Sequence, residues 1–232
     1  MTIQLPERVL NELDKLFIEI TSTDEHVRSR ATSRLIEFEK SGKIPLSALF
    51  DMLDEKNPVV VMYALGALGR NKSSEAVKKL TDMLGHPKAE NILITETIVD
   101  ALGETGQAEA AAPLLELLGL QTGLKKLLGS LVKKKKEPES KEAKSREYLT
   151  LPVIRALEKI SEPKSVEQIG SYLDHEDSLV RWHTLRALVG AKVTSFNDKV
   201  RQMSESDADE VVRDMAGIAI GKLAPLPNNL NN

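Results

Sequence analysis

Acidic and histidine side chains gather in one stretch of this chain where they could bind a divalent metal. The run Asp174-His175-Glu176-Asp177 holds residue types that coordinate such ions. Asp177 is also the residue expected to cap a helix, and the run lacks the fixed ligand spacing of a recognised metal site. We therefore predict that the chain uses no metal and no cofactor.

Covalent catalysis has no candidate nucleophile in the sequence. The chain has no cysteine, which excludes disulfides, thiol nucleophiles and zinc sites with thiolate ligands. No motif places a Ser–His–acid set, and the glycines fall at expected helix ends rather than in a phosphate-binding loop after a strand. The sequence therefore favours a protein that is not an enzyme.

Three arginines, Arg28, Arg181 and Arg213, occupy the same position of a recurring pattern. One interpretation is that they bind phosphate or carboxylate groups of a ligand. The other is that each pairs with an aspartate of a neighbouring repeat and holds the repeats together. The planar guanidinium fork suits carboxylate pairing, and we favour this second, structural interpretation.

The pattern behind these arginines is a repeat of about 32 residues. An apolar residue opens each copy, alanine usually follows seven residues later, and leucine or isoleucine follows eight residues later. The opening residues are Val27, Val60, Ile94, Leu149, Val180 and Val212. A period in this range is typical of stacked supersecondary units that share one continuous core.

Each repeat is predicted to form two helices. Asp or Asn stands three residues before five of the opening residues and is expected to cap the first helix. Gly69, Gly103 and Gly221, nine residues after the opening position, are expected to end that helix in a left-handed conformation. A second apolar pattern at offsets 17 to 24, for example Val77 to Leu84, predicts the second helix.

Further segments flank or interrupt the repeats. We predict one domain over residues 1–232, with an amphipathic capping helix at 6–20, a basic insertion at about 120–147 and a disordered tail at 225–232. The insertion follows from the interval between Ile94 and Leu149, which exceeds one period by about 22 residues. The other intervals lie between 31 and 34 residues.

The insertion combines regularly spaced leucines with many lysines. One interpretation is an extra packing helix followed by a solvated linker from the lysine run to Ser145. The other is a basic amphipathic element that recognises an anionic surface or an acidic partner. The lysines concerned are Lys125, Lys126, Lys133, Lys134, Lys135 and Lys136.

The remaining composition bounds the partners and the compartment. The net charge of −3 gives no general attraction to nucleic acid or to anionic membranes. A membrane surface would be contacted only through the basic insertion. There is no run of 18 apolar residues, and the N-terminus lacks a basic region followed by an apolar run. We therefore expect a cytoplasmic protein whose partner is another protein; the oligomeric state stays open.

Several motifs carry a family resemblance. Asp24-Glu25-His26-Val27-Arg28, the stretch from Ala64 to Gly69, Asp100-Ala101-Leu102-Gly103 and Leu179-Val180-Arg181 resemble HEAT repeats, especially the short prokaryotic repeats named after phycobilisome lyases. The resemblance implies an all-α fold, a right-handed α-solenoid of about five to six helix pairs. It also implies that the second helices line the concave side.

The resemblance suggests where a partner would bind and what the protein does. Solvent-facing residues of the second helices, together with the tryptophan of the fifth first helix, are the candidates. They are Glu75, Lys78, Lys79, Asp82, Glu116, Glu167, Gln168, Ser171 and Trp182. The favoured function is a non-catalytic scaffold or adaptor. Family members also include bilin lyases, which form the alternative, and DNA-binding or base-excision proteins, which an acidic, aromatic-poor chain disfavours.

Overall fold

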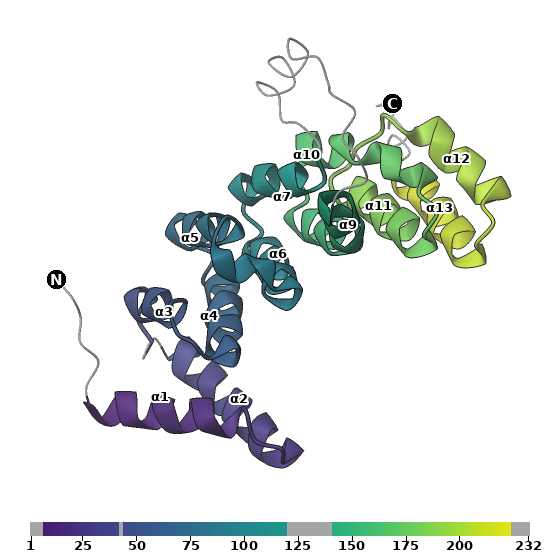
Figure 1. Cartoon of the computed structure of the whole chain (residues 1–232). Coiled ribbons are helices and arrows are strands. Elements are labelled where there is room, and N and C mark those ends of the chain that lie inside the picture. The colour runs from purple at the N-terminus through teal and green to yellow at the C-terminus, as the bar shows by residue number, and fades with distance from the viewer. Residues whose placement is uncertain (1–6, 42–43, 120–140, 224–232) are drawn as a thin grey trace, which may run out of the picture. The chain divides into compact units, whose positions relative to one another are not determined.

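The computed structural model describes residues 7–41, 44–119 and 141–223, apart from the side chains of 7–11 and 141–147 (Figure 1). These residues form α-helices, short 3-10 helices and turns, without any strand among them. The predicted all-α repeat fold is confirmed. The chain divides into two compact units, Met1–Thr105 and Gly106–Asn232, which are described separately. That the whole chain forms one domain stays a prediction.

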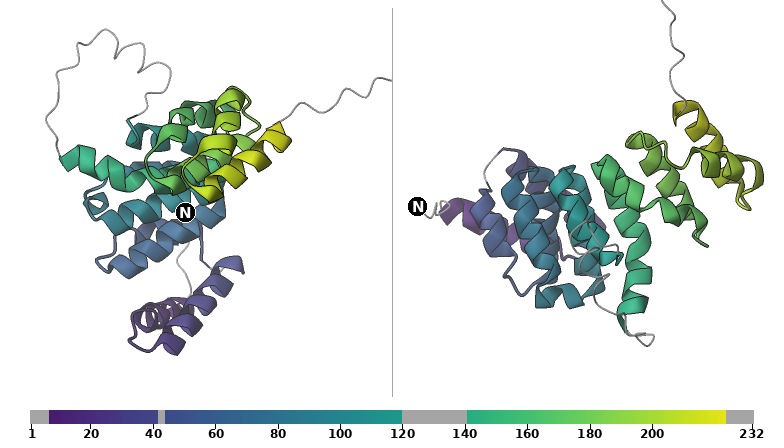
Figure 2. Two further views of the ribbon diagram at one scale, coloured as in Figure 1. Left: turned by 90° about the vertical axis from the view of Figure 1, so that its right-hand side faces the viewer. Right: turned by 90° about the horizontal axis from the view of Figure 1, so that it is seen from above.

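The N-terminal unit is built from helices that pack on their neighbours along the chain (Figure 2). α1 packs on α2, α3 packs on α4, and α4 packs on both α5 and α6. Their bounds are α1 Glu7–Glu19, α2 Glu25–Lys40, α3 Leu46–Met52, α4 Pro58–Asn71, α5 Ser74–Leu84, the 3-10 helix η1 Pro87–Glu90, and α6 Ile92–Thr105. The predicted capping helix at 6–20 is thus observed as α1, and it buries Leu13 and Leu16.

The C-terminal unit stacks its long helices in the same way. α7 packs on α9, α9 on α11, and α11 on α13, while α12 packs on α13. The bounds are η2 Ala108–Ala110, α7 Ala111–Leu117, α9 Lys141–Ile160, α10 Pro163–Gln168, η3 Gly170–Asp174, α11 Ser178–Gly190, α12 Asn197–Ser206 and α13 Glu210–Leu223. None of the helices in the described ranges is long and apolar enough to cross a membrane.

The predicted helix caps are confirmed in all five repeats that have one. In each case a side-chain oxygen accepts a hydrogen bond from the backbone N–H two residues later, at 2.8–3.0 Å. The capping residues are Asp24, Asn57, Asn91, Asp177 and Asp209. The remaining repeat has Arg146 at this position because α9 begins earlier, at Lys141, so that no cap is required there.

The repeated alanines and leucines form the core between successive first helices. Ala67, Ala101, Ala156, Ala187 and Ala219 are at most 3% exposed. Gly69 lies against Ala101 of the next first helix, so closely that a methyl group on Gly69 would meet the Ala101 backbone at 2.8 Å. In the first repeat this alanine position holds Arg34, which is exposed and reaches Glu12 on α1.

The predicted helix-ending role of the glycines is wrong. α4, α6 and α13 continue beyond Gly69, Gly103 and Gly221 by two residues. The left-handed residue occurs three positions later, twelve residues after the opening position, in four successive repeats. It is Lys72, Gly106, Ser161 and Lys192, with φ between 53° and 63°. Only one of these is glycine, which is why the sequence pattern did not indicate the true helix end.

The predicted extent of the solvated linker also needs correction. Residues 141–147 belong to α9, because that helix starts at Lys141, so a linker cannot extend to Ser145. The lysines from Lys125 to Lys136 and the tail at 225–232 lie outside the described residues. The interpretations of the insertion therefore stay predictions.

Candidate partner-binding surface

An exposed apolar column crosses the first helices of the C-terminal unit. Tyr148, Leu179 and Val211 stand one residue before the buried opening residues of α9, α11 and α13. Their exposed fractions are 72%, 55% and 62%. We call these three residues the apolar ridge. Large apolar side chains exposed at one position of three adjoining helices indicate a contact surface rather than scattered surface residues.

A cavity of about 250 Å³ adjoins this ridge between α11 and α13. We call it the Trp182 pocket; it is lined by Ser178, Leu179, Trp182, Asp209, Val211 and Val212. Leu179 and Trp182 reach it together because residues three apart share one helix face. An indole beside a small apolar cavity is a typical anchor point for a partner's side chain.

Neighbouring side chains hold the Trp182 indole in place. The Arg186 guanidinium lies 4.6 Å from the indole ring centre, within cation–π range, and the His183 ring lies edge-on at 4.8 Å. Glu158 of α9 contacts both of these residues, because its carboxylate lies 2.6 Å from His183 Nδ1 and 2.7 Å from Arg186 Nη2. This network fixes the indole without covering the pocket and reduces the entropy cost of partner binding.

The predicted binding residues on the second helices are mostly exposed, as expected. Glu75, Lys78 and Asp82 are exposed on α5, whereas Lys79 is half-buried with its ammonium 5.6 Å from the Phe50 ring centre. In the C-terminal unit, Glu116, Glu167, Gln168 and Ser171 are exposed on α7, α10 and η3. The Ser195 hydroxyl donates to Glu167 at 2.6 Å. These residues present no large apolar side chain, and their binding role stays a prediction.

The three arginines of the repeat bind backbone carbonyls of the turn that precedes their helix. Each donates from Nη1 to two backbone carbonyls, six and five residues before its own position, at 2.6–3.3 Å. The acceptors are Ser22 and Thr23 for Arg28, His175 and Glu176 for Arg181, and Asp207 and Ala208 for Arg213. The predicted pairing with an aspartate is thus observed only for Arg181, whereas Arg28 and Arg213 bind backbone carbonyls of the preceding turn, which were not predicted.

Repeats without arginine satisfy the same carbonyl with another donor. The Thr95 hydroxyl donates to the Ala89 carbonyl, again six residues earlier. In the repeat with Val61, Lys88 Nζ comes from a later turn and donates to the Glu55 carbonyl at 2.9 Å. A partly buried carbonyl at the start of a helix needs a hydrogen-bond donor, and in these five repeats the donor is an arginine, a threonine or a lysine.

Arg181 also forms the predicted bond between repeats. Its Nε and Nη2 donate to the two oxygens of Asp207 at 3.0 and 2.7 Å, in a bidentate ion pair that is largely buried. Burial alone would raise the pKa of Asp207, but the Arg181 hydrogen bonds outweigh it and hold the pKa below the ordinary value. The same pair raises the pKa of Arg181.

The side chains of the acidic run around His175 bind groups in and near the turn before α11. The His175 Nδ1 atom accepts a hydrogen bond from the Asp177 backbone N–H, and Asp177 caps α11 as predicted. Asp174 forms an ion pair with Lys199. Within the described ranges no three or more histidine and acidic residues converge on a possible metal position.

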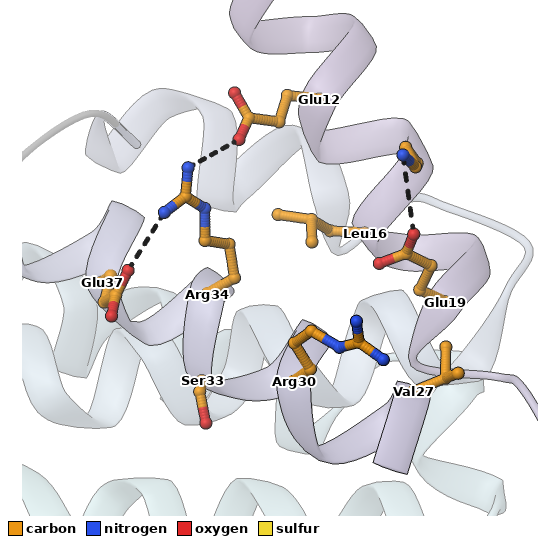
Figure 3. A pocket seen from close by; sticks show the side chains of 9 residues that line it. Glu12, Leu16, Glu19, Val27, Arg30, Ser33, Arg34 and Glu37 are labelled. Carbon is orange, nitrogen blue, oxygen red and sulfur yellow. Dashed lines mark hydrogen bonds and ion pairs between the residues drawn. The ribbon is translucent and has the colours of Figure 1, made fainter. Parts of the chain in front are cut away.

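The N-terminal unit carries a second, larger groove between α1 and α2 (Figure 3). Its volume is about 510 Å³, and Arg34 bridges Glu12 at 3.3 Å and Glu37 at 3.4 Å across it. Three basic and three acidic side chains line it: Lys15, Arg30, Arg34, Glu12, Glu19 and Glu37. Because these charges balance, the groove has no clear preference for a ligand of either sign.

Comparison with known proteins places the chain in a family. A family model of HEAT repeats matches residues 46–123 and 142–221. The chain belongs to the HEAT repeat family. The two matched segments leave out the part of the basic insertion between them, which agrees with the repeat spacing. A search of curated proteins found no match.

Solved structures share the fold of this HEAT repeat protein at low sequence identity. The complex of CpcE and CpcF of phycocyanin lyase from Nostoc sp. PCC7120 is 19% identical, with 88% of this chain and 74% of that chain covered and a TM-score of 0.51. A designed armadillo repeat protein in complex with the peptide (KR)4 is 17% identical, with 92% and 100% covered and a TM-score of 0.51. An archaeal HEAT-like repeat protein from Thermococcus onnurineus NA1 is 14% identical, with 94% and 93% covered and a TM-score of 0.48. For the two structures with a TM-score of 0.51, the likeness at these identities shows the fold alone.

Sequence reasoning singled out Trp182 but missed the apolar ridge. The signal was present in the repeat alignment: the position before the opening residue is apolar in five of six repeats, namely Val59, Leu93, Tyr148, Leu179 and Val211. In the four of these repeats that have a helix cap, this position follows the cap by two residues. It lies away from the core stripe of the helix, where polar residues are expected. A column of apolar residues at an outward position is the pattern that would have identified the surface.

Proposed function

We propose that this HEAT repeat protein is a non-catalytic scaffold or adaptor that binds another protein through the apolar ridge and the Trp182 pocket. The observation that supports this function is the exposure of Leu179 and Val211 at the pocket that Trp182 lines, with Tyr148 exposed at the same repeat position of α9. Protein interfaces concentrate their binding energy on tryptophan and tyrosine anchors surrounded by apolar contacts.

Affinity capture with matched surface variants tests this function. Leu179→Ser combined with Val211→Ser removes two ridge side chains that are exposed, so the fold should be retained. The control is Ile18→Ser on α1, because Ile18 is 72% exposed and lies outside the ridge. We expect the double variant to lose partners that the wild type and the control retain. Equal capture by all three proteins would show that the ridge is not the binding surface.

A bilin lyase subunit is the second candidate function. Its support is the likeness in fold to the CpcE and CpcF complex. The two candidates differ in a simple experiment, in which the protein is mixed with free bilin and the absorbance of the re-purified protein is recorded. A saturable spectral change would favour the lyase function, whereas a scaffold should leave the bilin spectrum unchanged.

A further inference from the structure

Four acidic residues surround the Trp182 pocket without an ion-pair partner. Glu176 and Asp177 directly precede the lining residue Ser178, while Asp209 lines the pocket and Glu210 follows it. None of the four forms an ion pair with any residue in the described ranges. The Asp177 and Asp209 carboxylates accept hydrogen bonds from backbone N–H groups and, for Asp209, from the Ser178 hydroxyl. The cation whose charge reaches both of them, Arg181, is already paired with Asp207.

The basic residues of the same edge are already engaged. Arg181 binds Asp207 and two turn carbonyls, Arg213 binds two turn carbonyls, and Lys199 pairs with Asp174. The Ser178 hydroxyl and the Val212 N–H hold the pKa of Asp209 below its ordinary value, so this carboxylate is charged at neutral pH. Backbone carbonyls do not cancel the charge of Arg213, but the four carboxylates without an ion-pair partner outnumber it, so the edge presents an apolar cavity in a net negative field.

From this arrangement we propose that the pocket receives a short segment of another protein in which an apolar side chain is flanked by lysine or arginine. The inference rests on the proposed function and specifies its partner. The apolar side chain fills the cavity beside Trp182, and the flanking cations lie near Glu176 and Glu210. An acidic or uncharged segment lacks the contacts between flanking cations and Glu176 or Glu210. Charge complementarity of this kind sets the specificity and the association rate of binding.

The fluorescence of Trp182 reports occupancy of this pocket directly, because it is the single tryptophan of the chain. The full-length protein is titrated with three synthetic peptides of equal length: one of leucine and lysine, one of leucine and glutamate, and one of serine and lysine. We expect a saturable change of Trp182 emission with the leucine–lysine peptide and much weaker responses with the other two. Affinity for the leucine–lysine peptide should fall as the salt concentration rises.

Two double variants separate the charge contribution from the apolar contribution. Glu176→Gln with Glu210→Gln leaves the helix caps Asp177 and Asp209 intact. It should lower the affinity for the leucine–lysine peptide by roughly three- to tenfold at low salt, with little effect at high salt. Leu179→Ser with Val211→Ser should lower the affinity for the same peptide by about tenfold or more at either salt concentration. The matched control, Asp51→Asn with Asp54→Asn, changes the net charge equally at two exposed residues of the N-terminal unit and should leave the affinity unchanged.

The outcomes distinguish this inference from the proposed function. The basic partner would be overturned if the leucine–glutamate peptide bound as tightly as the leucine–lysine peptide. It would also be overturned if binding were independent of salt and unchanged by the Glu176 and Glu210 substitutions. Either result would leave an apolar docking site. Equal binding of the serine–lysine peptide would overturn the role of the cavity. A Trp182 signal that depends on protein concentration alone would assign the pocket to a second copy. Tighter peptide binding after deletion of residues 121–140 would assign it to the chain's own basic segment. The proposed function itself fails only if the ridge variants also leave captured partners unchanged.

Discussion

At the scale of single residues, Gly69 shows how closely the first helices approach one another. A methyl group there would meet the Cα and carbonyl oxygen of Ala101 at 2.8 Å, and a backbone cannot move aside as a flexible side chain can. We expect Gly69→Ala to lower the free energy of unfolding by about 1–3 kcal/mol.

Gly217→Ala on α13 is the control, because nothing lies within 4 Å of its added methyl group. That change should raise stability by about 0.5–1 kcal/mol through helix propensity. Urea denaturation measures both, and equal effects would contradict the close contact.

The ion pair between Arg181 and Asp207 predicts a pH dependence of stability. The pKa of Asp207 is lower in the folded protein than in the unfolded chain, so the unfolded state takes up its proton first on acidification. The pair therefore stabilises the fold fully above the ordinary aspartate pKa, and this contribution is lost as the pH falls through the lowered folded value.

Arg181→Met tests this linkage. At neutral pH we expect a loss of about 3 kcal/mol, because Asp207 remains buried without its partner. Thermal unfolding measured from neutral to strongly acidic pH should show a smaller acid destabilisation for the variant than for the wild type. Parallel pH profiles would mean that Asp207 is not held by Arg181.

At the scale of helices and turns, three non-glycine residues end first helices in the left-handed conformation. Lys192 has φ of 56° and is exposed, so its side chain is not needed for packing. Lys192→Gly should stabilise the protein by about 0.5 kcal/mol, because relief of left-handed strain exceeds the added freedom of the unfolded chain. Gly106→Ala, at the same repeat position with φ of 63°, should have the opposite sign and cost about 1 kcal/mol. Denaturation midpoints of the two variants that move in the same direction would refute a shared left-handed helix end.

These elements also show what the sequence could predict. The five caps and the alanine column were predictable because one side chain, Asp/Asn or Ala, performs each task in nearly every repeat. The turn contacts were not, because arginine, threonine and a lysine from a later turn satisfy the same kind of carbonyl. The end of α4 was missed for a related reason: Gly69 is small in order to pack against Ala101, and Lys72 forms the left-handed turn.

At the scale of the whole molecule, the candidate surface depends on relations that a single sequence position does not contain. Trp182 was recognisable by residue type, but its pocket requires α13 to bring Val211 beside α11. The sign of the surrounding charge was equally hidden, because Arg181 and Arg213 appear available in the sequence and are engaged in the fold. The family assignment gives the fold, whereas the proposed partner is inferred from the contacts of this chain.

The last prediction concerns residues 121–140, which lie between α7 and α9 in the sequence. α7 and α9 pack on each other directly, and the spacing from Ile94 to Leu149 exceeds one period, so the stack does not need residues 121–140 for its contacts. Replacing these residues with a short Gly/Ser bridge should retain the helical circular dichroism signal and shift the melting temperature by only a few degrees, since loop length has a weak effect on closure entropy. The control deletion removes α5, Ser74–Leu84, which buries Val77, Leu80 and Met83 in the core, and should abolish cooperative unfolding. Loss of helical signal in the first variant would show that the segment belongs to the packed stack, and the repeat boundaries would then have to be redrawn.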